Sequence, residues 1–163
     1  MSVLPALFEH NRWANLRLIE ACRTVPDEVL DAEVPGAYGP IRSTLLHLAS
    51  AEQRYIGGLR GRPVEPRVHE TLGFPGWDAL AASLRETGSA ALEYARTVKP
   101  GEVVRGRRQS GEAYEVPAQT LLLQVINHAT EHRVNVTTAL AARGLDAPAL
   151  DGWAFGEEAD SGR

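Results

Sequence analysis

The sequence predicts an all-α fold: a four-helix bundle with a long connector between its second and third helices and a short β-hairpin before its fourth. Three observations support this. Four segments repeat apolar residues at alternating spacings of four and three, which places them on one face of an α-helix. Clusters of proline and glycine separate these segments. One segment before the last helix alternates with a period of two instead, as a strand does.

The first helix is expected over residues 3–24. Ser2 can cap it, and Pro5 is tolerated in its first turn because the N–H that proline lacks would have no acceptor within the helix. Its inner face is expected to hold Leu4, Phe8, Asn11, Asn15, Leu18 and Cys22. The prolines and glycines between residues 26 and 39 then predict a loop.

The second helix is expected over residues 40–59 and the third over residues 75–98. The inner face of the second is expected to hold Ile41, Leu45, Leu48, Glu52, Tyr55 and Leu59. The inner face of the third is expected to hold Trp77, Ala81, Leu84, Gly88, Ala91, Ala95 and Val98. The connector of about 15 residues is longer than a helical hairpin needs, so a crossover is possible and the topology is left open.

The segment "EVVRGRRQSGEAYEV" predicts a two-stranded hairpin around "QSG". A fourth helix follows over residues 117–143, with Gly144 as the expected residue after its end. Its buried face is predicted at Leu121, Val125, His128, His132, Asn135, Ala139 and Ala142. This pattern points both histidines inward.

All of residues 1–163 are expected to form a single domain. After the fourth helix, Trp153 and Phe155 are expected to fold back on the bundle, and residues 157–163 are expected to form a mobile tail.

The net charge of −4 argues against a chain built to bind nucleic acid, and the one basic cluster, "RGRR" at residues 105–108, is expected to solvate a loop. No run of 18 apolar residues predicts a membrane span, and the first residues lack the apolar core of a signal peptide. The single cysteine, Cys22, excludes an intramolecular disulfide. A cytoplasmic protein without membrane or nucleic-acid partners is therefore expected.

The inward-facing His128 and His132 need partners, because a buried imidazole outside water must be hydrogen-bonded or bind a metal. One reading is a metal site, since imidazoles one turn apart can converge on one ion. The other is a pair of core histidines satisfied by polar side chains. A metal would need a third ligand: His10 and His69 are expected at the surface, whereas His47 lies at the boundary of the second helix's apolar face, where the pattern leaves its role open.

Three segments together resemble a known family. "LFEHNRWANLRLIEA" contains an N-x-W-x-N core. "AYGPIRSTLLHLASAE" is similar to a G-x-I-x-x-T-L-x-H stretch with a downstream glutamate, here His47 and Glu52. "LLLQVINHATEHR" carries an H-x-x-x-H-R signature, here His128, His132 and Arg133. In this order, over about 140 residues, they resemble the DinB/YfiT-like family of metal-dependent enzymes.

The resemblance implies a four-helix bundle, frequently a homodimer, in which His47, His128 and His132 hold a divalent metal with open positions. Relatives include thiol transferases and isomerases that use low-molecular-weight thiols. The sequence departs from many members of the family, which have a second histidine where Glu131 stands and a Gly-Gln pair after the arginine. These departures affect the surroundings of the ligands and leave the three histidines in place.

Three neutral nitrogens and an open position suit a divalent transition metal, with Zn or Ni favoured. The expected function is a metal-dependent hydrolase or low-molecular-weight-thiol S-transferase acting on a small molecule, with Glu52 as general base or as the carboxylate that orients a ligand histidine. The alternative is a non-catalytic, dimeric, stress-related helical module with a structural or regulatory metal. Asn11 and Asn15 are expected either to border the cleft or to form packing hydrogen bonds, and Glu131 to be solvated.

Overall fold

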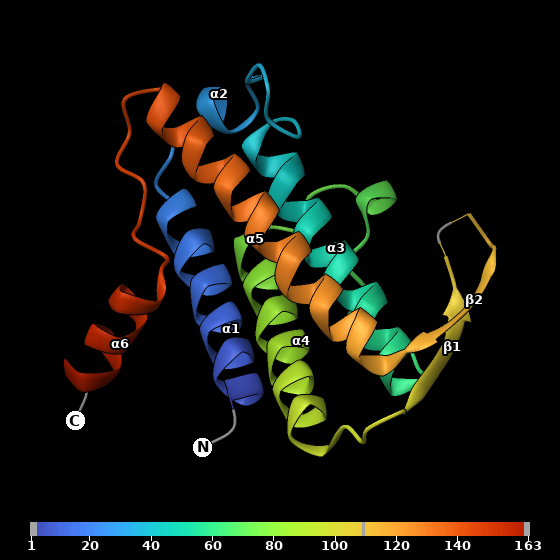
Figure 1. Ribbon diagram of the computed structural model, residues 1–163. Coiled ribbons are helices and arrows are strands. Elements are labelled where there is room, and N and C mark those ends of the chain that lie inside the picture. The colour runs from blue at the N-terminus through green and yellow to red at the C-terminus, as the bar shows by residue number, and fades with distance from the viewer. Residues whose placement is uncertain (1–2, 109, 162–163) are drawn as a thin grey trace.

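The computed structural model describes residues 3–108 and 110–161. Four long helices form the bundle (Figure 1), namely α1 (Val3–Cys22), α3 (Ile41–Arg60), α4 (Trp77–Thr97) and α5 (Ala118–Ala142). The smaller elements are α2 (Asp27–Leu30), the 3-10 turn η1 (Glu70–Leu72), strands β1 (Val103–Arg107) and β2 (Ala113–Pro117), and α6 (Gly152–Ser161). The prediction of a helical fold with a short hairpin is confirmed. Across the described residues, no helix is both long and apolar enough to cross a bilayer.

The helices run up, down, down and up, so α1 and α5 are parallel to each other and antiparallel to α3 and α4 (Figure 1). Two hydrophobic clusters, one toward each end of the bundle, indicate the same helix directions. One cluster contains Phe8, Ile56, Ala91 and Leu122. The other contains Leu18, Leu45, Leu80 and Leu140. The start of α3 thus shares a cluster with the start of α4, and the connector between them is a crossover.

The crossover connector is fixed to α3 along its length. Val64 is buried in one hydrophobic cluster and Val68 in the other, so the connector passes from one end of the core toward the other. The Gln53 side chain of α3 donates to the carbonyl oxygen of Pro66 at 2.8 Å and accepts from the backbone N–H of Val68 at 2.9 Å. The second bond satisfies the backbone N–H of the buried Val68, and together the two bonds place η1 beside α3.

The predicted helix ends are correct to within two residues, and Gly144 has the positive φ of 69° expected after the end of α5. The cap assigned to Ser2 lies outside the described residues. The predicted face of α5 is wrong at Ala142, which is exposed, and at Asn135, which is only half-buried. Arg133 is buried instead. A strict seven-residue repeat drifts by about 20° per heptad on a straight helix, which moves the buried stripe away from the predicted positions.

The segment after α5 forms a helix, α6, that the sequence analysis did not predict. Phe155 packs against α1, with its ring centroid 5.4 Å from that of Trp13 and 5.6 Å from that of His10. Trp153 does not fold back as expected, since it is 85% exposed. Residues two positions apart on a helix point in nearly opposite directions, so one helix face cannot bury both aromatics. The mobility of residues 157–163 stays a prediction, and residues 162–163 lie outside the described part.

Tyr114 docks the hairpin on the bundle. It faces Gly106 across the two strands, and its hydroxyl lies against Gly58 of α3. A Cβ atom at Gly58 would meet that hydroxyl oxygen at 2.6 Å, closer than real Cβ contacts come. The missing side chain on α3 therefore leaves room for the phenol, and the contact holds the hairpin beside the helix.

We expect the free energy of unfolding of the Gly58→Ala variant to be about 1–3 kcal/mol lower than that of the Gly156→Ala variant, because adding atoms to a filled site costs that much. Both substitutions gain the same helix propensity, and a Cβ at Gly156 meets nothing within 4 Å. Urea unfolding followed by circular dichroism measures the difference. Adding Tyr114→Phe to Gly58→Ala should recover most of the loss, because it removes the clashing oxygen. Equal stability of the two alanine variants would contradict the docking contact.

Candidate metal centre

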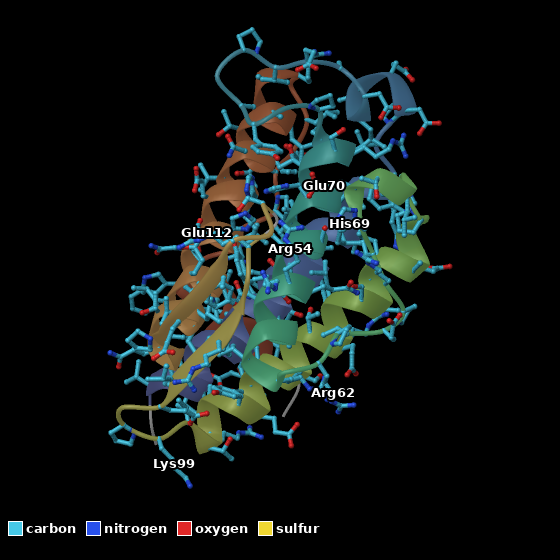
Figure 2. All side chains as sticks on the ribbon, turned by 90° about the vertical axis from the view of Figure 1, so that its right-hand side faces the viewer. Arg54, Arg62, His69, Glu70, Lys99 and Glu112 are labelled. Atoms are coloured by element: carbon cyan, nitrogen blue, oxygen red, sulfur yellow. The ribbon has the colours of Figure 1, made fainter. Side chains whose placement is uncertain are left out.

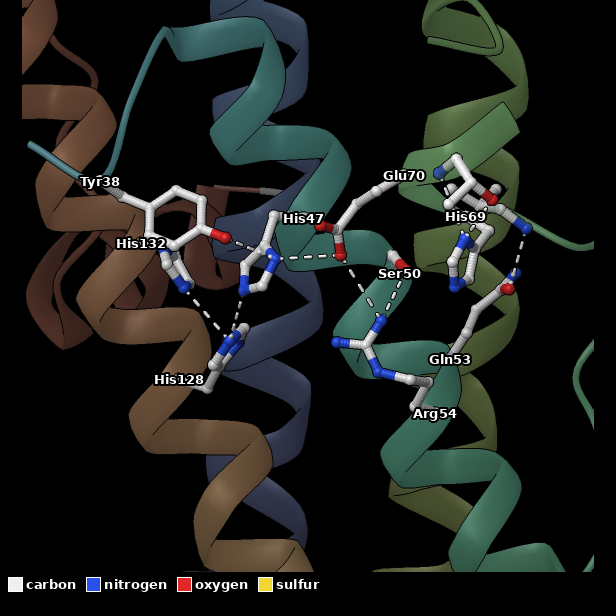
Figure 3. Close-up of polar contacts among 11 residues, drawn as sticks. Tyr38, His47, Ser50, Gln53, Arg54, His69, Glu70, His128 and His132 are labelled. Atoms are coloured by element: carbon white, nitrogen blue, oxygen red, sulfur yellow. Dashed lines mark hydrogen bonds and ion pairs between the residues drawn. The ribbon is translucent and has the colours of Figure 1, made fainter. Parts of the chain in front are cut away.

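Three histidines from two neighbouring antiparallel helices meet on one side of the bundle (Figure 3). His128 and His132 lie one turn apart on α5, and His47 lies in the second turn of α3. The Nε2 atom of His128 is 3.2 Å from that of His47 and 3.1 Å from that of His132. Nitrogens bound tetrahedrally to one zinc ion at about 2.0–2.1 Å lie roughly 3.4 Å apart, so the spacing fits a shared ion.

The imidazoles of α5 are in the protonation state that a metal requires. Burial lowers the pKa of His128 to about 4, with a further contribution from the charges of His132 and His47. Burial also lowers the pKa of His132. Both rings are therefore neutral at pH 7, and a neutral ring nitrogen has a lone pair to donate to a cation. The donor set fits a divalent ion of the late first transition row.

The orientation of His47 is set by residues outside the helices of the bundle. Its Nδ1 atom lies 3.0 Å from Oε1 of Glu70 in η1 and 2.9 Å from the hydroxyl oxygen of Tyr38. The same Glu70 oxygen lies 3.6 Å from the guanidinium of Arg54, which also donates to Ser50 at 2.8 Å (Figure 3). A proton on Nδ1, donated to the carboxylate, leaves the Nε2 lone pair directed at the other two histidines.

Tyr38 covers two of the three rings. Its ring centroid lies 4.5 Å from that of His47 and 4.7 Å from that of His132. Burial, and then the charge of Glu70, raises the pKa of its phenol, so the hydroxyl stays protonated at neutral pH. The side chain is nevertheless 52% exposed. It therefore presents a hydrogen-bonding group at the solvent side of the site.

The histidines of α5 lack comparable support. His132 Nδ1 is buried and has no hydrogen-bond partner among the described residues. Glu131 is exposed as expected, and its charge acts on the pKa of His132 only as a minor influence that raises it. Among the described residues, His47 is thus the one of the three histidines whose Nδ1 atom contacts a carboxylate.

Glu52 is buried inside the bundle and its hydrogen bonds involve no histidine. Its carboxylate accepts from Thr87 at 2.5 Å, from Asn15 at 2.9 Å and from Asn11 at 3.5 Å. Burial raises its pKa, while the bond from Thr87 and the charge of Arg133 act in the opposite direction. The structure does not bring Glu52 to the three histidines, and its catalytic role stays a prediction.

Arg133 completes this buried network from α5. Its guanidinium donates to the side-chain oxygens of Asn11 and Asn15, each at 2.7 Å, and to Thr130 at 2.9 Å. Burial lowers its pKa to about 10, so it remains charged at pH 7. The two amides therefore bridge a buried cation and a buried carboxylate. Their predicted alternative role as packing hydrogen bonds is the one that the structure shows.

Sequence reasoning missed Tyr38, Arg54 and Glu70. Two of them lie in irregular segments, where no periodicity indicates which way a side chain points. His69, one of the candidate third ligands, accepts from the backbone N–H of Thr71 in the 3-10 turn. His10, another candidate, bonds to the carbonyl oxygen of Leu150 at 2.8 Å. Neither belongs to the cluster.

Comparison with known proteins identifies the family of this chain. A sequence profile described as the DinB family matches residues 1–162. Protein DinB of Bacillus subtilis (strain 168) is 23% identical over 162 residues, which cover 89% of this chain and 88% of that protein. With a match over nearly its whole length, the chain belongs to the DinB family.

Proposed function

We propose that this protein is a metal-dependent enzyme in which His47, His128 and His132 hold one divalent ion, zinc or nickel. The observation that carries the proposal is the convergence of three Nε2 atoms from α3 and α5. Three imidazole ligands with an open side are typical of catalytic sites, because structural zinc sites are closed by a fourth protein ligand. The open side favours a bound small molecule.

The reaction class is hydrolysis or transfer of a low-molecular-weight thiol. When bound, the ion supplies Lewis acidity, which lowers the pKa of water or of a thiol. Glu70 holds the ring of His47 in place, and the Tyr38 hydroxyl can donate a hydrogen bond to a substrate at the solvent side. Glu52 supports the bundle in this scheme, because its oxygens are already occupied by Thr87, Asn11 and Asn15.

The test is a screen for turnover by the metal-loaded protein. The panel contains bacillithiol, mycothiol and glutathione with an electrophilic acceptor, together with ester and amide substrates. Turnover that disappears on chelation and returns with zinc or nickel would support the proposal. Absence of metal-dependent turnover across the panel would favour a non-catalytic, dimeric module with a structural or regulatory metal. Glu70 supports that alternative. Its carboxylate already contacts His47 and Arg54, so it is not free to act as a general base.

Glu70→Ala is expected to weaken metal binding about 10- to 100-fold, the usual effect of removing a carboxylate that orients a ligand histidine. Competition with a chromogenic chelator measures the affinity. Glu65→Ala is the matched control, because it removes an equal charge from an exposed position of the same connector. If both variants bind metal equally well, Glu70 does not support the site.

A further inference from the structure

A groove of about 640 Å³ lies between the second half of α3, the crossover connector and β1. Figure 2 shows this face, with Arg54 and Arg62 labelled. Its lining includes Arg54, Arg62, Arg67, Arg105, Arg107 and Arg108. These are six of only seventeen basic residues in a chain of net charge −4. Such a concentration of cations in an acidic protein creates a local positive potential that the composition as a whole does not predict.

Part of this charge is available to a ligand, although four of the six arginines already have a partner within the protein. Arg105 and Arg108 pair with glutamates of the same hairpin, but these pairs are exposed and therefore weak. Within the described part of the chain, the exposed side chains of Arg62 and Arg67 form no hydrogen bond or ion pair. Glu65 is the one acidic residue of the lining. The groove thus has a clear excess of positive charge.

The size of the groove favours a small molecule. Its volume lies within the range of about 300–1,000 Å³ that is usual for pockets binding small ligands. Gly61 also lines the groove, and a Cβ atom there would meet nothing within 4 Å, so this part of the lining is free of side chains. A nucleic acid would need a larger basic surface, and the negative charge of the rest of the chain would repel it.

Arg54 connects this groove with the three histidines. It lines the groove, and its guanidinium lies 3.6 Å from the Glu70 oxygen that contacts His47 Nδ1 at 3.0 Å. We propose that the groove binds a small anion with two or more carboxylate or phosphate groups, whose remaining part reaches past Arg54 toward His47. Its assignment as the substrate rests on the proposed enzymatic function, whereas the binding of the anion does not.

The test is calorimetric titration of the full-length, metal-loaded protein with propane-1,2,3-tricarboxylate. Arg62→Ala/Arg67→Ala should weaken binding at least about ten-fold, because each arginine contributes a charge-assisted contact. Arg85→Ala/Arg96→Ala removes the same charge from exposed positions on α4 and should change binding less than about two-fold. Inorganic pyrophosphate in a parallel titration tells whether phosphate or carboxylate is preferred, and binding of either supports the proposal.

Three results would overturn it. The neutral trimethyl ester could bind as tightly as the tricarboxylate, the two double variants could behave alike, or a single-stranded oligonucleotide could bind more tightly than both small anions. The His47→Ala variant separates this proposal from the proposed function. It should lose the metal and still bind the tricarboxylate, so that failure of the metal site and failure of the groove give different results.

Discussion

His128→Ala is expected to reduce the metal content from about one ion per chain to less than about a tenth, because two imidazoles alone hold a divalent ion weakly. His128 is the central ligand, since its Nε2 atom contacts both His47 and His132. Elemental analysis after exhaustive dialysis measures the loss. His47→Ala and His132→Ala should behave in the same way.

The matched controls are His10→Ala and His69→Ala, which remove a histidine engaged elsewhere. Both should retain the metal. The metal-free His128→Ala protein should also stay folded by circular dichroism, because a chain of this size has a hydrophobic core that does not depend on an ion. Metal that persists unchanged in all three ligand variants would refute the assignment of the site.

Much of the bundle could be predicted from the sequence, because helical periodicity reports which face of each helix is buried. It does not report which helices are neighbours. The pair His128 and His132 lies on one helix, so spacing alone made a metal site conceivable. His47 lies on another, and it joined the set only through the resemblance to the DinB/YfiT-like family. The crossover makes α3 antiparallel to α5 and so brings His47 to the pair. It depends on how the whole chain packs, which the pattern within a single helix does not report.

The surroundings of the site were the hardest part to predict. Tyr38 and Glu70 come from segments outside the long helices, and their positions follow from how the loop and the crossover connector lie on α3. Arg133 was recognised only as part of a motif. A charged residue is rarely buried unless it is paired, so its burial could be foreseen only together with Glu52 and the two asparagines.

The buried network leads to the second large effect. Arg133→Met is expected to lower the free energy of unfolding by about 3–5 kcal/mol, because it leaves the Glu52 carboxylate buried without its countercharge. The side-chain oxygens of Asn11 and Asn15 also lose their donor. Urea unfolding at pH 7 measures the change. Arg17→Met, which breaks an exposed ion pair with Glu158, is the control and should cost no more than about 1 kcal/mol.

The pH dependence of the unfolding free energy of the Arg133→Met variant identifies the cause of its lower stability. Burial already raises the pKa of Glu52, and loss of Arg133, whose charge opposes that shift, should raise it further. A carboxyl group whose pKa is higher in the folded than in the unfolded chain binds a proton on folding, so its contribution to stability falls as the pH rises through the folded-state pKa. The loss of unfolding free energy relative to wild type should therefore be smaller at about pH 5 than at about pH 8.

The double variant Glu52→Gln/Arg133→Met removes both charges. Its loss of unfolding free energy, the deficit, should be smaller than the sum of the deficits of the two single variants. A deficit that is additive and independent of pH would mean that Arg133 stabilises the bundle by packing alone.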